Sequence, residues 1–192
     1  MATVAQDPKT RLRDVWVIDG ASDTASRVTT SGNASFAGWG PDSNQIIWRA
    51  REPDGHIDIR LATWNGRWSE ELLFTSDRNT YSHDWSRDGQ FVLFSMDQEN
   101  NQSSTLSVLR IGPPVSVQQY LTGPGAKTNA RFSPDGHWVA YESDETGRPE
   151  VRVQSFPDPH RQYTISTAGG MRPRWRRDGN ELFYLTTDGG VM

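Results

Sequence analysis

Apolar and polar positions along the chain repeat one pattern four times. Each copy has an aromatic residue, two small or polar residues, Asp, then Gly or Ser, a polar residue and a mainly apolar run. The copies are 36–48, 83–94, 130–141 and 173–184. Their aspartates are 46, 47 and 43 residues apart: Asp42, Asp88, Asp135 and Asp178. Because a near-constant period of this length indicates a repeat architecture, the chain reads as consecutive copies of one structural unit.

The polar centre of each copy predicts a tight turn between two antiparallel strands. In the third copy, Pro134 pre-sets φ, Asp135 tolerates the next position, and Gly136 takes the positive φ that follows. This chemistry predicts a type I turn closed by a glycine bulge. The same structural role falls to Asp42, Asp88, Gly89, Asp178 and Gly179. The first copy has Ser43 in place of Gly, so its turn should be strained or of another type.

Two more strand candidates follow each of the first three hairpins, as in 150–155 and 162–166 of the third unit. Four short strands in about 45 residues make one blade of a β-propeller. A blade packs flat against both neighbours, so its strands should be apolar on both faces. The repeated aromatic residues should then lie in the core between blades: Trp39, Trp85, Phe132 and Trp175.

The predicted fold is therefore all-β, a propeller of four-stranded antiparallel blades. We expect an N-terminal tail at 1–11, followed by repeats from 12 to 192: a half-blade at 12–31, complete blades at 34–76, 80–122 and 127–168, and a half-blade at 171–192. Either the two halves combine into a fourth blade, or the chain is a partial ring from a larger propeller. We favour the partial ring, because four blades is the lower limit for propellers.

Composition narrows the possible partners. The net charge of -4 argues against a nucleic-acid surface, which is normally basic. The chain has no cysteine, and its four histidines lack metal-ligand spacing, so we expect no disulfide, metal or cofactor. Met1 to Thr10 lack the apolar core of a signal peptide, and no run approaches the roughly 20 apolar residues of a membrane span. We therefore expect a soluble chain without membrane insertion, whose parent could still be periplasmic or membrane-attached.

At its four hairpins the sequence resembles the propeller repeat of TolB and its relatives, a WD-repeat-like family whose hallmark is Trp-Ser-Pro-Asp-Gly before an apolar strand. The third copy, 131–148, is the nearest match, and its continuation to Tyr184 is similar to the propeller attached to bacterial serine/threonine protein kinases. The pattern departs from the family at Gly40, Ser43, Arg87, Arg176 and Arg177. The resemblance implies a protein- or ligand-interaction module with a sensory or scaffolding role.

Catalytic motifs are missing from the sequence. It contains neither the loops of a kinase core nor a Gly-x-Ser-x-Gly nucleophile elbow, so we predict no catalytic residue. His83 and Asp84 are adjacent on a strand and should point to opposite faces, which excludes a dyad. For binding we single out charged positions on the first strand of each blade and on the loop 143–148, which lies on the predicted rim: His83, Asp84, Arg131, Arg174, Asp144 and Arg148.

Three hypotheses about function follow. The first is a non-catalytic interaction propeller from a larger bacterial signalling or envelope protein, binding a protein or a small ligand at its rim. The second is the propeller of a prolyl-oligopeptidase-like serine hydrolase, which requires a catalytic domain elsewhere in the parent. The third is a self-contained small ring with a lectin-like or structural role. An open arc would also expose apolar blade faces, through which we expect self-association.

Overall fold

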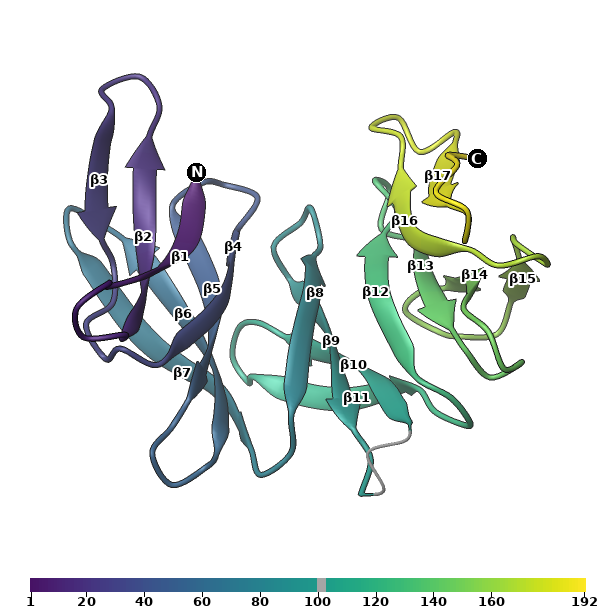
Figure 1. The fold of residues 1–192 in the computed structure, drawn as a ribbon, viewed down its shortest axis with the longest axis horizontal. Coiled ribbons are helices and arrows are strands. Elements are labelled where there is room, and N and C mark those ends of the chain that lie inside the picture. Colours follow the sequence, from purple (N-terminus) through teal and green to yellow (C-terminus); the bar gives the residue numbers. More distant parts are fainter. Residues whose placement is uncertain (100–102) are drawn as a thin grey trace. The chain divides into compact units, whose positions relative to one another are not determined.

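The computed structural model of the chain describes residues 1–99 and 103–192. Throughout these ranges the chain forms antiparallel sheets, and no helix among them is long and apolar enough to cross a membrane (Figure 1). The chain divides into two compact units, Met1–Ser82 and His83–Met192. The all-β prediction and the four-stranded antiparallel blades are confirmed.

The first unit holds one three-stranded sheet and one four-stranded sheet (Figure 1). The three-stranded sheet has the strands β1 (Ala2–Gln6), β2 (Arg13–Asp19) and β3 (Thr24–Arg27). The four-stranded sheet is a blade in sequence order, made of β4 (Ala34–Trp39), β5 (Gln45–Arg51), β6 (Ile57–Trp64) and β7 (Trp68–Ser76).

Strand β1 differs from the expected tail at 1–11. Its five residues pair with β2 in antiparallel register, from Ala2 opposite Val17 to Gln6 opposite Arg13. The turn between them begins at Asp7, whose carboxylate accepts hydrogen bonds from the backbone N–H groups of Lys9 and Thr10. The segment is therefore an ordered strand, because its backbone groups find partners on β2 that the local sequence does not reveal.

Two further four-stranded sheets and a final hairpin complete the chain. The sheet of the second blade is made of β8 (Thr80–Trp85), β9 (Phe91–Asp97), β10 (Ser104–Arg110) and β11 (Ser116–Leu121). The third blade has β12 (Lys127–Phe132), β13 (Trp138–Ser143), β14 (Glu150–Ser155) and β15 (Gln162–Thr164). The hairpin is β16 (Met171–Trp175) with β17 (Leu182–Leu185).

Each unit has a core formed between neighbouring sheets, as blade packing predicts. In the first unit, Val15 on β2 and Val28, just after β3, cluster with Ile46 and Trp48 of the four-stranded blade. In the second unit, the cluster joins side chains of two successive blades: Leu93, Leu106, Val108, Tyr120, Ala130, Phe132, Val139, Tyr141 and Phe156. The repeated aromatic residues, which the sequence places in this core, are buried to different extents. Phe132 is buried, whereas Trp39, Trp85 and Trp175 are only partly buried.

The four hairpin turns share one construction. In each, the Asp carboxylate accepts a hydrogen bond from the backbone N–H two residues later, over 3.3, 3.0, 3.1 and 3.0 Å at Asp42, Asp88, Asp135 and Asp178. The residue after Asp has positive φ, between 73° and 79° at the three glycines. Ser43 adopts φ of 59° at the same place. The first turn therefore keeps the common geometry, with a side chain in the left-handed region that glycine occupies elsewhere.

The first strands of three repeats contain a second irregularity. Phe36, Asn129 and Arg172 occupy equivalent positions and have φ of 52°, 49° and 52°. Each lies where the register with the second strand shifts, between Ser35 and Ala37 in β4 and at the matching places of β12 and β16. A β-bulge of this kind re-aims the side chains that follow it. It therefore sets the direction of Arg131 and Arg174, two residues after the positive φ.

Candidate functional site

Charged side chains occupy one repeat position on the first strands of the second unit. Asp84 on β8, Arg131 on β12 and Arg174 on β16 each precede the repeated aromatic residue. The Asp84 carboxylate accepts a hydrogen bond from the backbone N–H of Phe132 over 2.9 Å. On the other side of β12, the indole Nε1 of Trp175 donates to the carbonyl of Arg131 over 3.2 Å. These two bonds hold three first strands next to one another at the level of the charges.

The three charges influence one another. Burial raises the pKa of Asp84, and the positive charge of Arg131, the hydrogen bond from Phe132 and the more distant charge of Arg174 oppose that rise. Burial likewise lowers the pKa of Arg131, and Asp84 opposes the change while Arg174 adds to it. The cluster of Asp84, Arg131 and Arg174, which we call the first-strand cluster, thus has two cations and one anion.

Both guanidinium groups of this cluster retain unused hydrogen-bond donors. Arg131 Nη1 donates to the carbonyl of Ala130 over 3.2 Å, and Arg174 Nη1 donates to that of Pro173 over 2.8 Å. Within residues 1–99 and 103–192, neither guanidinium has a carboxylate oxygen within 4.0 Å. A guanidinium carries five N–H donors in a planar fork that matches a carboxylate or phosphate. The arrangement is therefore suited to an anionic group.

The side chain of His83 contacts a different strand from the one that its neighbour Asp84 contacts. Its Nε2 lies 2.7 Å from the hydroxyl of Ser95 on β9, the adjacent strand of the same blade. Burial and the nearby charge of Arg131 lower the pKa of His83 to about 3. The ring is neutral at pH 7, and its contact with Ser95 is structural. His83 and Asp84 thus contact different strands and form no dyad.

The two predicted loop residues have structural partners of their own. The Asp144 carboxylate accepts the backbone N–H of Ala126 over 2.6 Å, joining the loop 143–148 to the segment before β12. Arg148 donates to the Glu150 carboxylate over 2.7 Å and to the carbonyl of Thr167. Within the described part of the chain, no hydrogen bond or ion pair joins either residue to the first-strand cluster. The six predicted residues therefore form no single site.

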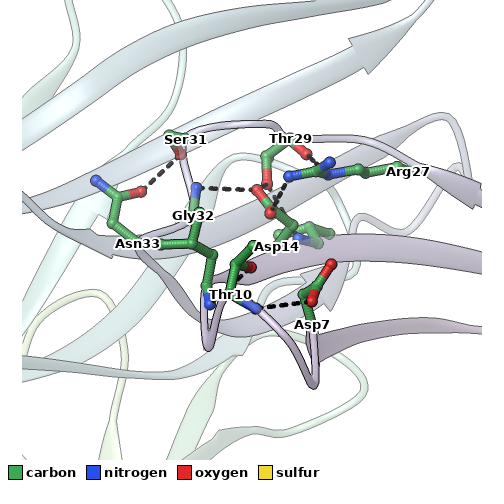
Figure 2. A network of polar contacts seen from close by, with 10 residues as sticks. Asp7, Thr10, Asp14, Arg27, Thr29, Ser31, Gly32 and Asn33 are labelled. Atoms are coloured by element: carbon green, nitrogen blue, oxygen red, sulfur yellow. Dashed lines mark hydrogen bonds and ion pairs between the residues drawn. The ribbon is translucent and has the colours of Figure 1, made fainter.

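Buried carboxylates at the start of β2 and of β14 escaped the sequence analysis. Asp14, on β2, accepts hydrogen bonds from the hydroxyl of Thr29 over 2.8 Å and from the N–H of Gly32 over 3.1 Å, and it pairs with Arg27 (Figure 2). The Thr29 hydroxyl in turn accepts the backbone N–H of Val15. Asp14 thus ties its own sheet to the linker that enters the next blade.

Glu150, on β14, makes the same set of contacts in the second unit. It accepts from the Ser166 hydroxyl, from the N–H of Gly169 over 3.1 Å and from Arg148, while Ser166 accepts the N–H of Val151. In the sequence, the pattern that marks this contact is an acidic residue before Val or Ile, with a glycine three residues earlier. That glycine has positive φ. Arg11, with φ of 63°, occupies the position that Gly147 occupies before Glu150. Because Arg11 stands where a glycine is expected, the sequence does not show that Asp14 and Glu150 occupy equivalent positions. These carboxylates are structural ties between repeats, and no group of three His, Asp or Glu side chains among the described residues could hold a metal ion.

Comparisons with known proteins agree on the fold. No family model matches the chain. An uncharacterized protein of Agrobacterium fabrum is 26% identical over an alignment of 133 residues, and the match covers 62% of this chain and 40% of that protein. The crystal structure of TolB from Acinetobacter baumannii has a TM-score of 0.77 at 19% identity and covers 99% of this chain and 51% of its own. A putative TolB from Agrobacterium tumefaciens has a TM-score of 0.76 at 16% identity, covering 100% of this chain and 79% of its own.

Enzymes with an attached propeller are also similar. Prolyl oligopeptidase B from Galerina marginata has a TM-score of 0.72 at 7% identity, covering 99% of this chain and 29% of its own. The class of fold is therefore a β-propeller of four-stranded antiparallel blades. More narrowly, the fold of the blades is similar to that of the TolB structures. The chain spans 40% of its curated relative and about half of the A. baumannii TolB structure, at 51%.

Proposed function

We propose that the chain is a non-catalytic interaction module and that its first-strand cluster binds an anionic group of a protein or small ligand. The observation that carries the proposal is the pair of guanidinium groups on Arg131 and Arg174. Among residues 1–99 and 103–192, each donates a hydrogen bond only to the carbonyl of the preceding residue. In a propeller the first strand of each blade lies nearest the central channel. A ligand group entering there would meet donors that no carboxylate among the described residues occupies.

The electrostatics favour a carboxylate or phosphate as the ligand group. Arg131 is partly buried, so its charge acts through a lower effective dielectric than that of an exposed arginine. Asp84 leaves the cluster one positive charge in excess. A planar anion that reaches both guanidiniums would balance that charge and satisfy donors that otherwise need water.

We also propose that the chain is part of a larger bacterial protein, either a kinase-linked signalling protein or an envelope protein. Support comes from the resemblance of the third and fourth repeats to kinase-attached propellers and from the length of the A. baumannii TolB structure, which is about twice the part that this chain covers. Reading the gene on both sides tests this proposal. A kinase domain or a membrane anchor in frame would support it, and a catalytic hydrolase domain would overturn it.

The second candidate is the propeller of a serine hydrolase. The observation in its favour is the TM-score of 0.72 with prolyl oligopeptidase B, of which this chain covers 29%. It predicts a Gly-x-Ser-x-Gly domain in the parent. Measurable turnover of peptide or ester substrates by this chain alone would contradict both candidates, because each assigns it no catalytic group.

Binding to the first-strand cluster can be measured with peptides of defined charge. We expect a fluorescent peptide of alternating Glu and Gly to bind, with salt weakening the binding, and its Lys counterpart not to bind. Arg131→Gln with Arg174→Gln should abolish binding, whereas Arg177→Gln, on the exposed fourth turn, should leave it unchanged. Equal loss of binding in both variants would mean that general surface charge, and not the first-strand cluster, attracts the peptide. That result, or no binding by the unmodified chain, would overturn the proposal.

A further inference from the structure

Three tryptophan side chains line a pocket in the first unit, far in sequence from the first-strand cluster. The pocket has a volume of about 250 Å³, and its lining residues are Val17, Ser26, Trp39, Ser43, Trp64 and Trp68. The ring centroids of Trp39 and Trp68 are 6.3 Å apart, and those of Trp64 and Trp68 are 5.2 Å apart. Three of the eight tryptophans in the chain therefore gather around one cavity.

The pocket has a fixed base and an open side. Trp39 and Trp68 are partly buried and pack against the core of the first unit. Trp64 lies directly opposite Trp68 across the β6–β7 hairpin, and 48% of its surface is exposed. The three indoles together form a contiguous apolar surface that is partly open to water, and such surfaces commonly mark interaction sites.

The lining narrows the chemistry of a ligand. The indole planes are tilted by 51° and 56°, so the rings form walls at an angle rather than one flat stacking platform. Among the residues that the structure describes, no charged side chain lines the pocket, and the hydroxyls of Ser26 and Ser43 are its side-chain hydrogen-bonding groups other than the indole N–H groups. Such a pocket suits a rounded group that needs no ion pair. Indole faces attract cations, and tryptophan does so best among the aromatic side chains.

We propose that this tryptophan pocket binds a quaternary ammonium group of the choline type. A trimethylammonium group is rounded, carries its charge without N–H donors, and loses little hydration on entering an aromatic pocket. This inference concerns another unit of the chain and other residues than the proposed function, and it does not depend on it. If no anion binds at Arg131 and Arg174, the proposal for the tryptophan pocket still stands. If no choline binds in the pocket, the proposed function still stands.

Proton NMR of choline titrated with the full chain tests the proposal. Ring currents of the three indoles should move the trimethyl resonance upfield and broaden it as the protein concentration rises. The control probe is the neutral carbon isostere of choline, in which a tert-butyl group replaces the trimethylammonium group. We expect choline to bind at least about fivefold more tightly, because the isostere has the shape without the charge. Equal binding of the two probes would overturn the proposal in favour of a plain apolar pocket.

Variants assign the effect to the pocket. Trp64→Leu keeps an apolar side chain but removes one indole face, and it should weaken choline binding at least about fivefold. Trp138→Leu, a partly buried tryptophan of the second unit that contacts Tyr163, is the matched control and should bind as the unmodified chain does. Ser26→Leu keeps every tryptophan and fills the pocket, so it should block binding even if Trp64→Leu fails to fold. Full binding by Ser26→Leu would overturn the assignment.

The source of the trimethylammonium group is distinguished by a further arm of the experiment. Free choline is compared with phosphatidylcholine vesicles in a sedimentation assay, with phosphatidylglycerol vesicles as the control. Binding to free choline alone indicates a small solute, whereas sedimentation with phosphatidylcholine that Ser26→Leu abolishes indicates a lipid headgroup. Absence of binding in both arms overturns the proposal.

Discussion

The carboxylate of Asp84 accepts a hydrogen bond from the backbone N–H of Phe132 over 2.9 Å, joining the first strands of two successive blades. The donor belongs to Phe132, whose side chain is buried in the core, and the acceptor carboxylate interacts electrostatically with Arg131 and Arg174. One residue therefore connects the packing of the blades with the electrostatics of the first-strand cluster. Substitutions at Asp84 should affect both properties, and the two can be separated.

We predict that Asp84→Ala destabilises the chain and that Asp84→Asn does so less. Alanine leaves the N–H of Phe132 without its partner, which should cost about 1 to 3 kcal/mol in the free energy of unfolding. The amide oxygen of asparagine can still accept that bond. Urea denaturation measures both variants, with Asp158→Ala, at an exposed loop position, as the control. Equal losses for Ala and Asn would show that the charge of Asp84, rather than its hydrogen bond, stabilises the second unit.

Stability should fall as the pH is lowered through the range in which an unfolded histidine gains a proton. The pKa of His83 is about 3 in the folded chain, against the ordinary value of 6.5. Between these values the unfolded chain binds the proton and the folded chain does not, so this residue's contribution is complete above pH 6.5 and declines below it. The slope should approach about 1.4 kcal/mol per pH unit at most.

His83→Gln isolates this effect, because the amide can replace the contact with Ser95 and does not titrate. We expect its free energy of unfolding, measured in urea on both sides of pH 6.5, to depend less on pH than that of the unmodified chain. His137→Gln, on the exposed third turn, is the matched control. Asp84 acts in the opposite direction, since its raised pKa favours the folded state as the pH falls. An unchanged pH profile in His83→Gln would contradict the prediction.

The hairpins and blades could be predicted because their signals are local. In the third copy, Pro134, Asp135 and Gly136 specify a turn with three neighbouring residues, and the apolar strand after it needs only its own sequence. The same repeat register is enough to place Asp84, Arg131 and Arg174 at equivalent positions. It does not reveal their partners, because Phe132 lies 48 residues from Asp84.

The features that sequence reasoning missed depend on distant partners or on unusual backbone conformations. Asn129 and Arg172 adopt positive φ without being glycine, so nothing marks the bulges that direct Arg131 and Arg174. From the sequence alone, Asp14 resembles a solvent-exposed strand residue. Its burial depends on Thr29 and Gly32, which lie 15 and 18 residues away and donate hydrogen bonds to it. The tryptophan pocket combines residues from five strands and one turn, and Trp39 alone among its indoles belongs to the repeat pattern.

The tie at Asp14 should be sensitive to one hydroxyl. Thr29→Val keeps the shape of the side chain but removes the donor to Asp14 and the acceptor for the N–H of Val15. Asp14 keeps Gly32 and Arg27 as partners, but the buried N–H of Val15 loses its acceptor, which should cost about 1 to 3 kcal/mol in the free energy of unfolding. Thr30→Val, the exposed neighbouring residue, is the matched control and should change stability by less than about 0.5 kcal/mol. Equal effects in the two variants would mean that β-propensity, and not the tie, determines the outcome.

The first hairpin turn offers a reciprocal test of the repeat. Ser43 has φ of 59° where Gly136 has 73°, so Ser43→Gly should relieve the left-handed strain of about 1 to 2 kcal/mol. Part of that gain is lost, because glycine gives the unfolded chain about 0.5 to 1 kcal/mol more conformational entropy. We expect a net stabilisation, seen as a higher midpoint in urea. Gly136→Ser imposes the opposite change in the third turn, where a Cβ meets no atom within 4 Å, so any loss of stability there comes from the backbone conformation. If Ser43→Gly lowers the midpoint, the Ser43 side chain contributes more through the tryptophan pocket that it lines than its backbone conformation costs.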